Sequence, residues 1–167
     1  MRKQRKISMS LDPQSIGKAI SKLREYQKWF SEKTSELTER LATIGGSVAS
    51  RDFATAMYDG ENDVRVTVEP LRGNAGWAIK ANGKATLFIE FGSGSYHNSG
   101  EPHPNRPAGV AGIGKYGHGL GKRHGWVFRN VSGDWQFTRG NPASMPMHNA
   151  QQAIMEKIYD IAKEVLG

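Results

Sequence analysis

A regular pattern of apolar residues runs through the first third of the chain. Between residues 12 and 44 the apolar positions recur at alternating steps of four and three, which predicts one amphipathic helix. Asp12 and Pro13 favour the N-cap and the first helical position. The stripe comprises Ile16, Ile20, Leu23, Gln27, Phe30, Thr34, Leu37, Leu41 and Ile44. About 30 helical residues would span about 45 Å, which is more than one small core requires.

Two further helical segments are predicted. Gly45 and Gly46 should break or kink the first helix, and a second piece should run from Val48 to Tyr58. At the other end of the chain, the lead-in at 141–146 precedes another helical stripe. Its members are Met147, Ala150, Ile154, Ile158, Ile161 and Val165.

The middle of the chain, residues 60–140, has the pattern of β structure. Val64, Val66 and Val68 alternate with polar residues, and Asn82-Gly83 is a strong hairpin signal. Five strands are predicted, enough for a small antiparallel sheet or barrel. They lie at about residues 64–69, 77–81, 87–91, 126–129 and 135–138.

A long glycine-rich insertion interrupts this β region at residues 92–125. It contains ten of the twenty glycines and four of the five histidines of the chain. A segment of this composition buries too little apolar area to offset its ordering entropy, so it should order only against a partner. Its basic residues are Arg106, Lys115, Lys122 and Arg123.

Together these patterns predict an α+β fold: a flexible basic arm at 1–11 and one α+β domain at 12–167 with an extended loop at 92–125. The 167 residues include no cysteine, which excludes disulfides and thiolate metal sites. No apolar run reaches the ~18–20 residues that cross a bilayer, so no membrane role is expected. The net charge of +7 suits an acidic partner such as nucleic acid or an acidic protein.

The sequence carries no convincing catalytic or cofactor motif, so we expect neither an enzyme nor a bound cofactor. Gly112 to Gly117 matches the letters G-x-G-x-x-G, but it lacks the strand before and the helix after that a nucleotide site needs. The insertion histidines lack helical metal-ligand spacing, and Glu101 is the only acid among them. No metal site is therefore expected.

Glu90 and the tryptophans allow more than one interpretation. Glu90 lies in an apolar predicted strand, either on its outward face or as a fixed ion pair or backbone acceptor at a subunit boundary. Trp77, Trp126 and Trp135 lie in predicted strands and are expected in the core rather than as a base-stacking platform. Trp29 adjoins the helical stripe and suggests a protein contact.

Two short motifs resemble the tail-component family of long-tailed bacteriophages, the tail-completion or head–tail joining proteins of the neck. One is the Glu-Phe-Gly-Ser segment at 90–93, and the other is the Ala-x-x-Pro-apolar segment at 143–147, followed by Ala150. The order of elements is also similar over nearly the whole chain, although the insertion is longer than the connection in many relatives. The resemblance implies a small α+β fold, a homo-oligomeric ring that is expected to be hexameric, and no catalysis.

The first hypothesis is therefore a structural virion protein that forms a ring in the phage neck, made in the host bacterial cytoplasm. Its partners would be further copies of itself and neighbouring tail-tube, tail-terminator or connector proteins. The excess apolar stripe and the two motifs should contribute to these contacts. The expected interface residues are Phe30, Leu37, Leu41, Glu90, Phe91, Gly92, Ser93, Pro146 and Met147.

The alternative hypothesis is a basic nucleic-acid-binding module. The arm and the insertion residues Arg106, Lys115, Lys122 and Arg123 would contact phosphates, and binding would weaken steeply with salt. The two hypotheses overlap, because a neck ring can line the channel through which DNA passes and touch it transiently without sequence readout.

Overall fold

The computed structural model describes residues 7–74, 76–94, 96–97 and 124–167. Its elements, in chain order, are α1 (Pro13–Thr55), β1 (Arg65–Pro70), the short 3-10 helix η1 (Arg72–Asn74), β2 (Trp77–Asn82), α2 (Thr86–Phe91), β3 (Trp126–Arg129), β4 (Trp135–Thr138) and α3 (Pro146–Leu166). The mixed α+β class is confirmed. Within the described part of the chain, no helix is both long and apolar enough to cross a membrane.

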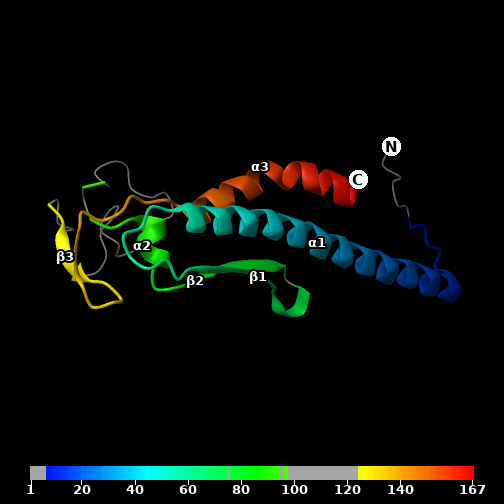
Figure 1. Cartoon of the computed structure of the whole chain (residues 1–167). Coiled ribbons are helices and arrows are strands. Elements are labelled where there is room, and N and C mark those ends of the chain that lie inside the picture. The colour runs from blue at the N-terminus through cyan, green and yellow to red at the C-terminus, as the bar shows by residue number, and fades with distance from the viewer. Residues whose placement is uncertain (1–6, 75, 95, 98–123) are drawn as a thin grey trace.

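Helix α1 is one continuous helix of 43 residues, about 65 Å long at 1.5 Å per residue. Asp12 caps its start, because the Asp12 carboxylate accepts a hydrogen bond from the Ser15 N–H at 2.8 Å. Figure 1 shows α3 along one side of the C-terminal half of α1 and the β1–β2 ribbon along the opposite side. The N-terminal half of α1 extends beyond both (Figure 1).

The predicted break at Gly45-Gly46 is wrong, because the helix continues through both residues. These glycines instead allow close packing on both sides of α1. A Cβ atom on Gly46 would lie 2.4 Å from Cγ2 of Val68 in β1, and one on Gly45 would lie 2.6 Å from Cδ1 of Ile154 in α3. The sequence signal was therefore one of close approach rather than of a kink.

Alanine substitutions at two glycines of α1, Gly17 and Gly46, should distinguish the gain in helix propensity from the cost of overpacking. Gly17 lies in the N-terminal half of α1, where a Cβ would meet no described atom within 4 Å, so Gly17→Ala should raise the unfolding free energy by about 0.5–1 kcal/mol. Gly46→Ala should lower it by about 1 kcal/mol or more, because overpacking against the stiff Val68 side chain outweighs the same propensity gain. Chemical denaturation of both variants measures the difference. Equal stabilisation by the two substitutions would contradict the close packing.

The predicted single sheet or barrel is not formed among the described residues. Strands β1 and β2 pair with each other, with Val66 opposite Ala81, and β3 and β4 form a separate antiparallel pair. The expected strand at 87–91 is wrong, because that segment is the short helix α2. Four of the five predicted strands are present, and they form two small ribbons.

Two apolar clusters hold the C-terminal half of α1 in place. Around the end of α1, the buried residues are Ala49, Phe53, Ala85, Ile89 and Ala150. Toward the middle of α1, Leu41 packs against Ile161 and Val165 of α3, with Leu37 at the margin. Because the last turns of α3 lie against Leu37 and Leu41, the part of α1 before residue 34 extends past the end of α3.

Candidate functional site

The main candidate surface is the N-terminal half of α1, residues 13–33, which we call the α1 extension. It carries the first half of the apolar stripe, and no described helix or strand covers it (Figure 1). Five of its large apolar side chains are 37–55% exposed. They are Ile16, Ile20, Leu23, Tyr26 and Phe30. Contiguous exposed apolar side chains of this kind mark an interaction surface.

The same stripe changes from uncovered to covered along one helix. Leu37 and Leu41 continue the four–three spacing of the extension, and these two residues pack against α3 within the chain. The extension therefore has the side-chain spacing of an established helix–helix contact, although none of the described helices packs on it.

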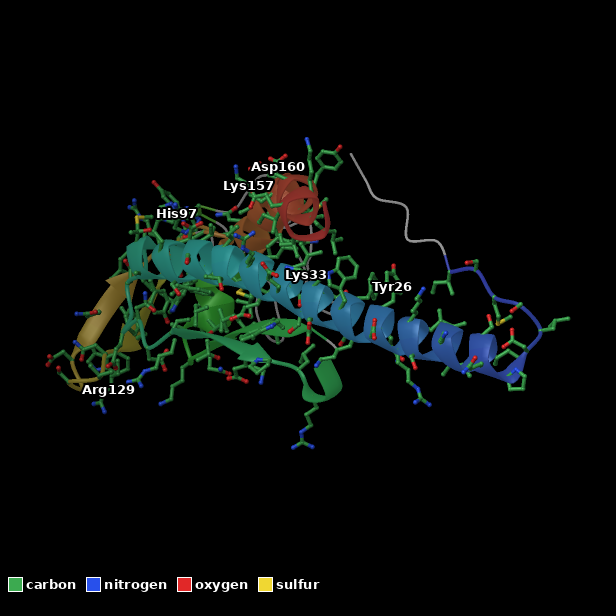
Figure 2. The ribbon with its side chains drawn as sticks, turned by 90° about the vertical axis from the view of Figure 1, so that its right-hand side faces the viewer. Tyr26, Lys33, His97, Arg129, Lys157 and Asp160 are labelled. Atoms are coloured by element: carbon green, nitrogen blue, oxygen red, sulfur yellow. The ribbon has the colours of Figure 1, made fainter. Side chains whose placement is uncertain are left out.

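Aromatic residues stack on one another along part of the extension. The ring of Tyr26 stacks with Trp29 at 5.7 Å and with Phe30 at 6.2 Å between centroids. Figure 2 shows Tyr26 on the part of α1 that extends from the body. Aromatic side chains lose little conformational entropy on contact and are enriched where proteins meet.

A second uncovered apolar face lies on the β3–β4 ribbon. Val127 is 60% exposed, Phe137 opposite it is 60% exposed, and Trp135 is 67% exposed. The guanidinium of Arg129 lies 5.3 Å from the centroid of the Trp135 ring. The core position expected for Trp135 is therefore wrong, because no second layer of described residues covers this face, whereas Trp77 and Trp126 are half-buried.

The two motifs behind the phage resemblance meet in space. Glu90, at the end of α2, is 5% exposed, and its carboxylate accepts hydrogen bonds from the N–H groups of Met147 at 2.8 Å and His148 at 3.1 Å. Met145, the N-cap residue of α3, has φ 54° and no side-chain capping bond. Glu90 thus supplies the negative charge and the acceptors that the start of α3 needs.

The last residue of the first motif, Ser93, also pairs with the residues that precede the second motif. Ser93 and Asn141 exchange two backbone hydrogen bonds, at 2.9 and 3.1 Å, and the Asn141 amide donates to the Phe88 carbonyl at 2.7 Å. Gly140, at φ 88°, passes so close that a Cβ there would lie 2.0 Å from the Ser93 carbonyl oxygen. The Glu-Phe-Gly-Ser segment therefore fastens α2 to the lead-in of α3.

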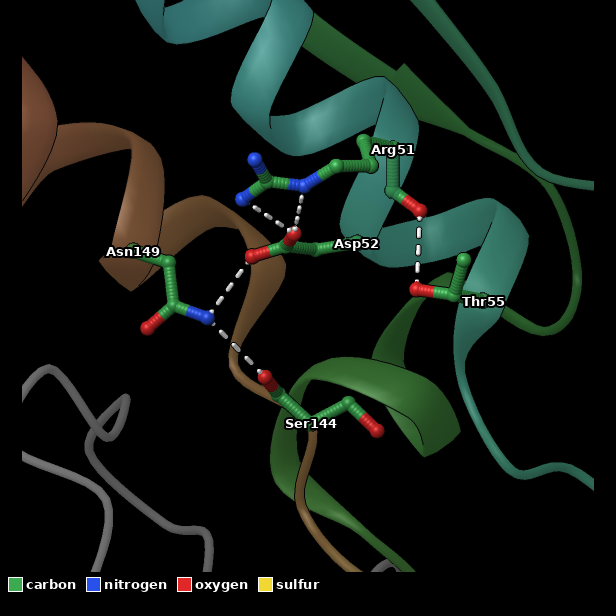
Figure 3. A network of polar contacts seen from close by, with 5 residues as sticks. All are labelled: Arg51, Asp52, Thr55, Ser144 and Asn149. Atoms are coloured by element: carbon green, nitrogen blue, oxygen red, sulfur yellow. Dashed lines mark hydrogen bonds and ion pairs between the residues drawn. The ribbon is translucent and has the colours of Figure 1, made fainter.

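A polar network at the same junction connects the end of α1 to the start of α3 (Figure 3). The Asn149 side-chain amide donates to the Asp52 carboxylate at 2.9 Å and to the Ser144 carbonyl at 3.3 Å. Arg51 completes the network with an ion pair to Asp52 at 2.9 Å. These contacts fix the direction in which α3 leaves the junction and lies along α1.

Asp63 fixes the start of α2 and makes its stability depend on pH. Its carboxylate accepts hydrogen bonds from the N–H groups of Ala85 at 3.0 Å and Lys84 at 2.9 Å, and these bonds hold the pKa of Asp63 below its ordinary value. Because the pKa of Asp63 is lower in the folded state, these hydrogen bonds contribute fully to folding stability above about pH 4. That contribution is lost as the pH falls through the lowered pKa.

We therefore expect the Asp63→Asn variant to lose less stability than the wild type as the pH falls below about 4. Thermal unfolding between pH 2 and pH 7 measures this, with Asp160→Asn on the exposed side of α3 as the control. If the unfolding temperature of Asp63→Asn changed with pH as that of the wild type does, the Asp63 cap would contribute nothing to the pH dependence of stability.

The predicted interface residues divide into two groups. Leu41, Glu90, Phe91, Gly92 and Pro146 are buried within this chain, in the core or at the junction, and their role at an interface stays a prediction. Glu90 is not on an outward face, and the backbone acceptor that was the alternative is confirmed, but within the subunit rather than at its boundary.

The remaining predicted residues are more accessible. Phe30 is 50% exposed, and Leu37, Ser93 and Met147 are half-buried. Arg106, Lys115, Lys122 and Arg123 lie outside the described residues. In the predicted arm, residues 7–11 have no regular structure and are exposed, whereas residues 1–6 lie outside the described part.

Several residues of this site were not expected from the sequence. Asp63 and Asn141 act on segments more than twenty and forty residues away, respectively, and no local pattern marks such partners. Tyr26 could have been found, because it lies four residues before Phe30 on the same side of a predicted helix.

Within the described residues, no three His, Asp or Glu side chains gather as a metal site would require. No protein-family model matches the chain, and neither the curated proteins nor the solved structures give a significant match.

Proposed function

We propose that this protein is a structural component of a tailed-phage virion, a tail-completion or head–tail joining protein that forms a homo-oligomeric ring in the neck. The observation that carries the proposal is the exposed stripe of the α1 extension, in which Ile16, Ile20, Leu23 and Phe30 are 37–55% exposed. A continuous helix cannot fold back to bury this stripe against the described body of its own subunit, so we expect another chain to cover it.

Two further features support this function. The motifs at 90–93 and 143–147 that resemble the phage family pair with each other at the junction, which is consistent with a role in holding the subunit shape. Burying the extension of each copy against another would convert the excess apolar surface into a repeating contact. The protein would then be located in the virion and made in the host bacterial cytoplasm.

Mass measurement and imaging test the proposal. At about 10 µM, a concentration typical of biological association, the chain should sediment as a closed oligomer. It should also appear as rings in negative stain. Six copies of the 18.4 kDa chain would have a mass of about 110 kDa. A strict monomer that also fails to join purified tail-tube or connector proteins would overturn the proposal.

A second candidate function is binding of single-stranded nucleic acid. The exposed rings of Trp135 and Phe137, with Arg129 beside Trp135, have the combination of stacking surface and charge that such binding uses. Trp135→Ala should then weaken binding to a single-stranded oligonucleotide, and the affinity of the wild type should fall steeply with salt. Negligible binding at about 50 mM salt would remove this candidate.

A further inference from the structure

The Asn82-Gly83 pair does not form the hairpin turn that its sequence predicts. The turn of the β1–β2 ribbon lies at the other end of the strands, where η1 follows β1. Asn82 is instead the last residue of β2, opposite Arg65, and Gly83 begins the connection from β2 to α2 (Figure 1). The pair therefore lies at an exposed strand end rather than at the centre of a hairpin turn.

The side chain of Asn82 differs from those of other asparagines in having no hydrogen bond. It is exposed, and its amide group bonds to nothing within the part of the chain that the structure describes. Four other asparagine side chains are each held by at least one hydrogen bond to the chain, and these are Asn62, Asn130, Asn141 and Asn149. The Asn82 amide is thus the one among these five that is able to rotate and react.

Close packing of the main chain requires glycine after Asn82. A Cβ atom on Gly83 would lie 2.8 Å from Cα of Val64 and 2.9 Å from the carbonyl oxygen of Asp63, and neither backbone atom can move aside as a flexible side chain could. Glycine also leaves its own backbone nitrogen uncrowded. Among the described residues the Gly83 N–H has no hydrogen-bond acceptor. An exposed side-chain amide is therefore followed directly by an accessible backbone nitrogen.

We propose that Asn82 is a site of spontaneous deamidation in the folded protein. The Gly83 backbone nitrogen attacks Cγ of the Asn82 side chain, and the new C–N bond closes a succinimide ring. The bond between Cγ and the side-chain nitrogen breaks, and this nitrogen leaves as ammonia with the proton from the Gly83 N–H. Water then opens the ring at either carbonyl and leaves aspartate or isoaspartate at position 82. Asparagine is among the residues most prone to such chemical loss.

Both products should weaken the start of α2. The Asp63 carboxylate accepts hydrogen bonds from the N–H groups of Lys84 and Ala85, which directly follow Gly83. A new carboxylate at position 82 places a like charge two residues before this cap, which disfavours the ionised form of Asp63. Isoaspartate also lengthens the main chain where it passes close to Val64. The modified chain should therefore melt at a lower temperature than the unmodified chain.

Peptide mapping by mass spectrometry tests the modification and depends on neither the ring nor the phage assignment. The full, folded chain is incubated in mildly alkaline buffer, and the asparagine-containing peptides are followed with time. We expect Asn82 to be converted to a mixture of aspartate and isoaspartate while Asn62, Asn130 and Asn149 remain amides. Isoaspartate is diagnostic, because direct hydrolysis of the side chain does not produce it. Conversion of Asn82 no faster than that of Asn130, or only in denaturant, would overturn the proposal.

Two glutamine variants provide matched controls. Asn82→Gln keeps an exposed amide on a longer side chain that closes a ring far less readily, so it should stay unmodified and keep its melting temperature throughout the incubation. Asn130→Gln should still be converted at Asn82, as the wild type is. The wild type should develop a fraction of lower melting temperature in step with the loss of the Asn82 amide. A wild type that is converted completely without any change of melting temperature would contradict the predicted effect on α2.

Discussion

Replacing Glu90 by alanine is expected to lower the free energy of unfolding by about 2–4 kcal/mol, because a buried, charged acceptor of two hydrogen bonds is lost. The substitution leaves the Met147 and His148 N–H groups at the start of α3 without their carboxylate acceptor, and it removes a charge from the positive end of the helix dipole. Since 1 kcal/mol shifts the melting temperature of a chain of this size by about 2–4 °C, the midpoint should fall by about 5–15 °C.

Two comparison variants separate capping from loss of volume. Glu90→Gln keeps the shape and one acceptor but loses the charge, and it should cost about half as much as alanine. Glu39→Gln, at an exposed position of α1, should change the unfolding free energy by less than about 0.5 kcal/mol. If Glu90→Ala melted at the wild-type temperature, the carboxylate could not be the cap of α3.

The helices were predictable because their periodicity is local. Asp12 and the stripe from Ile16 to Ile44 are sufficient to place α1, and the stripe from Met147 to Val165 is sufficient to place α3. These patterns record which face of a helix is apolar. They do not record whether a neighbour covers that face, so the uncovered extension and the covered half of α1 look alike in the sequence.

The short apolar segment at 87–91 shows where local patterns fail. Such a run fits a buried strand or a buried helix equally well, and its length favoured a strand. The outcome depends on Asp63, whose carboxylate binds the N–H groups of Lys84 and Ala85 and so starts a helix from a distant part of the chain. The kink predicted at Gly45 and Gly46 is wrong for a related reason. The low helix propensity of these glycines is offset by the close approach of β1 and α3, which lie far away in the sequence.

The candidate site was predicted only in part. Phe30 belongs to the exposed stripe, as the excess length of the helix suggested. The motif residues Glu90 and Pro146 are buried at the junction. A motif can maintain the internal geometry of a subunit as well as a contact with a partner, and the sequence alone does not distinguish the two.

Removing the α1 extension should abolish assembly while leaving the subunit folded. A chain that begins at Ser31, after an initiating methionine, keeps a serine that can cap the shortened helix. It also keeps both buried clusters that hold α1, which involve residues from Leu37 onward. We therefore expect its unfolding free energy to stay within about 1 kcal/mol of the full chain, since mainly exposed side chains are removed. Sedimentation should show a monomer at concentrations where the full chain is a ring.

A full-length variant provides the matched comparison. Leu23→Ser with Phe30→Ser removes two exposed apolar side chains of the extension and keeps its length and charge. It should weaken assembly strongly without a change of more than about 0.5 kcal/mol in the stability of the monomer, because neither residue is buried in the subunit. A truncated chain that still formed rings would place the subunit contact elsewhere. A truncated chain that lost several kcal/mol would mean instead that the extension is stabilised within its own subunit, so that its apolar stripe is not the surface left for a neighbour.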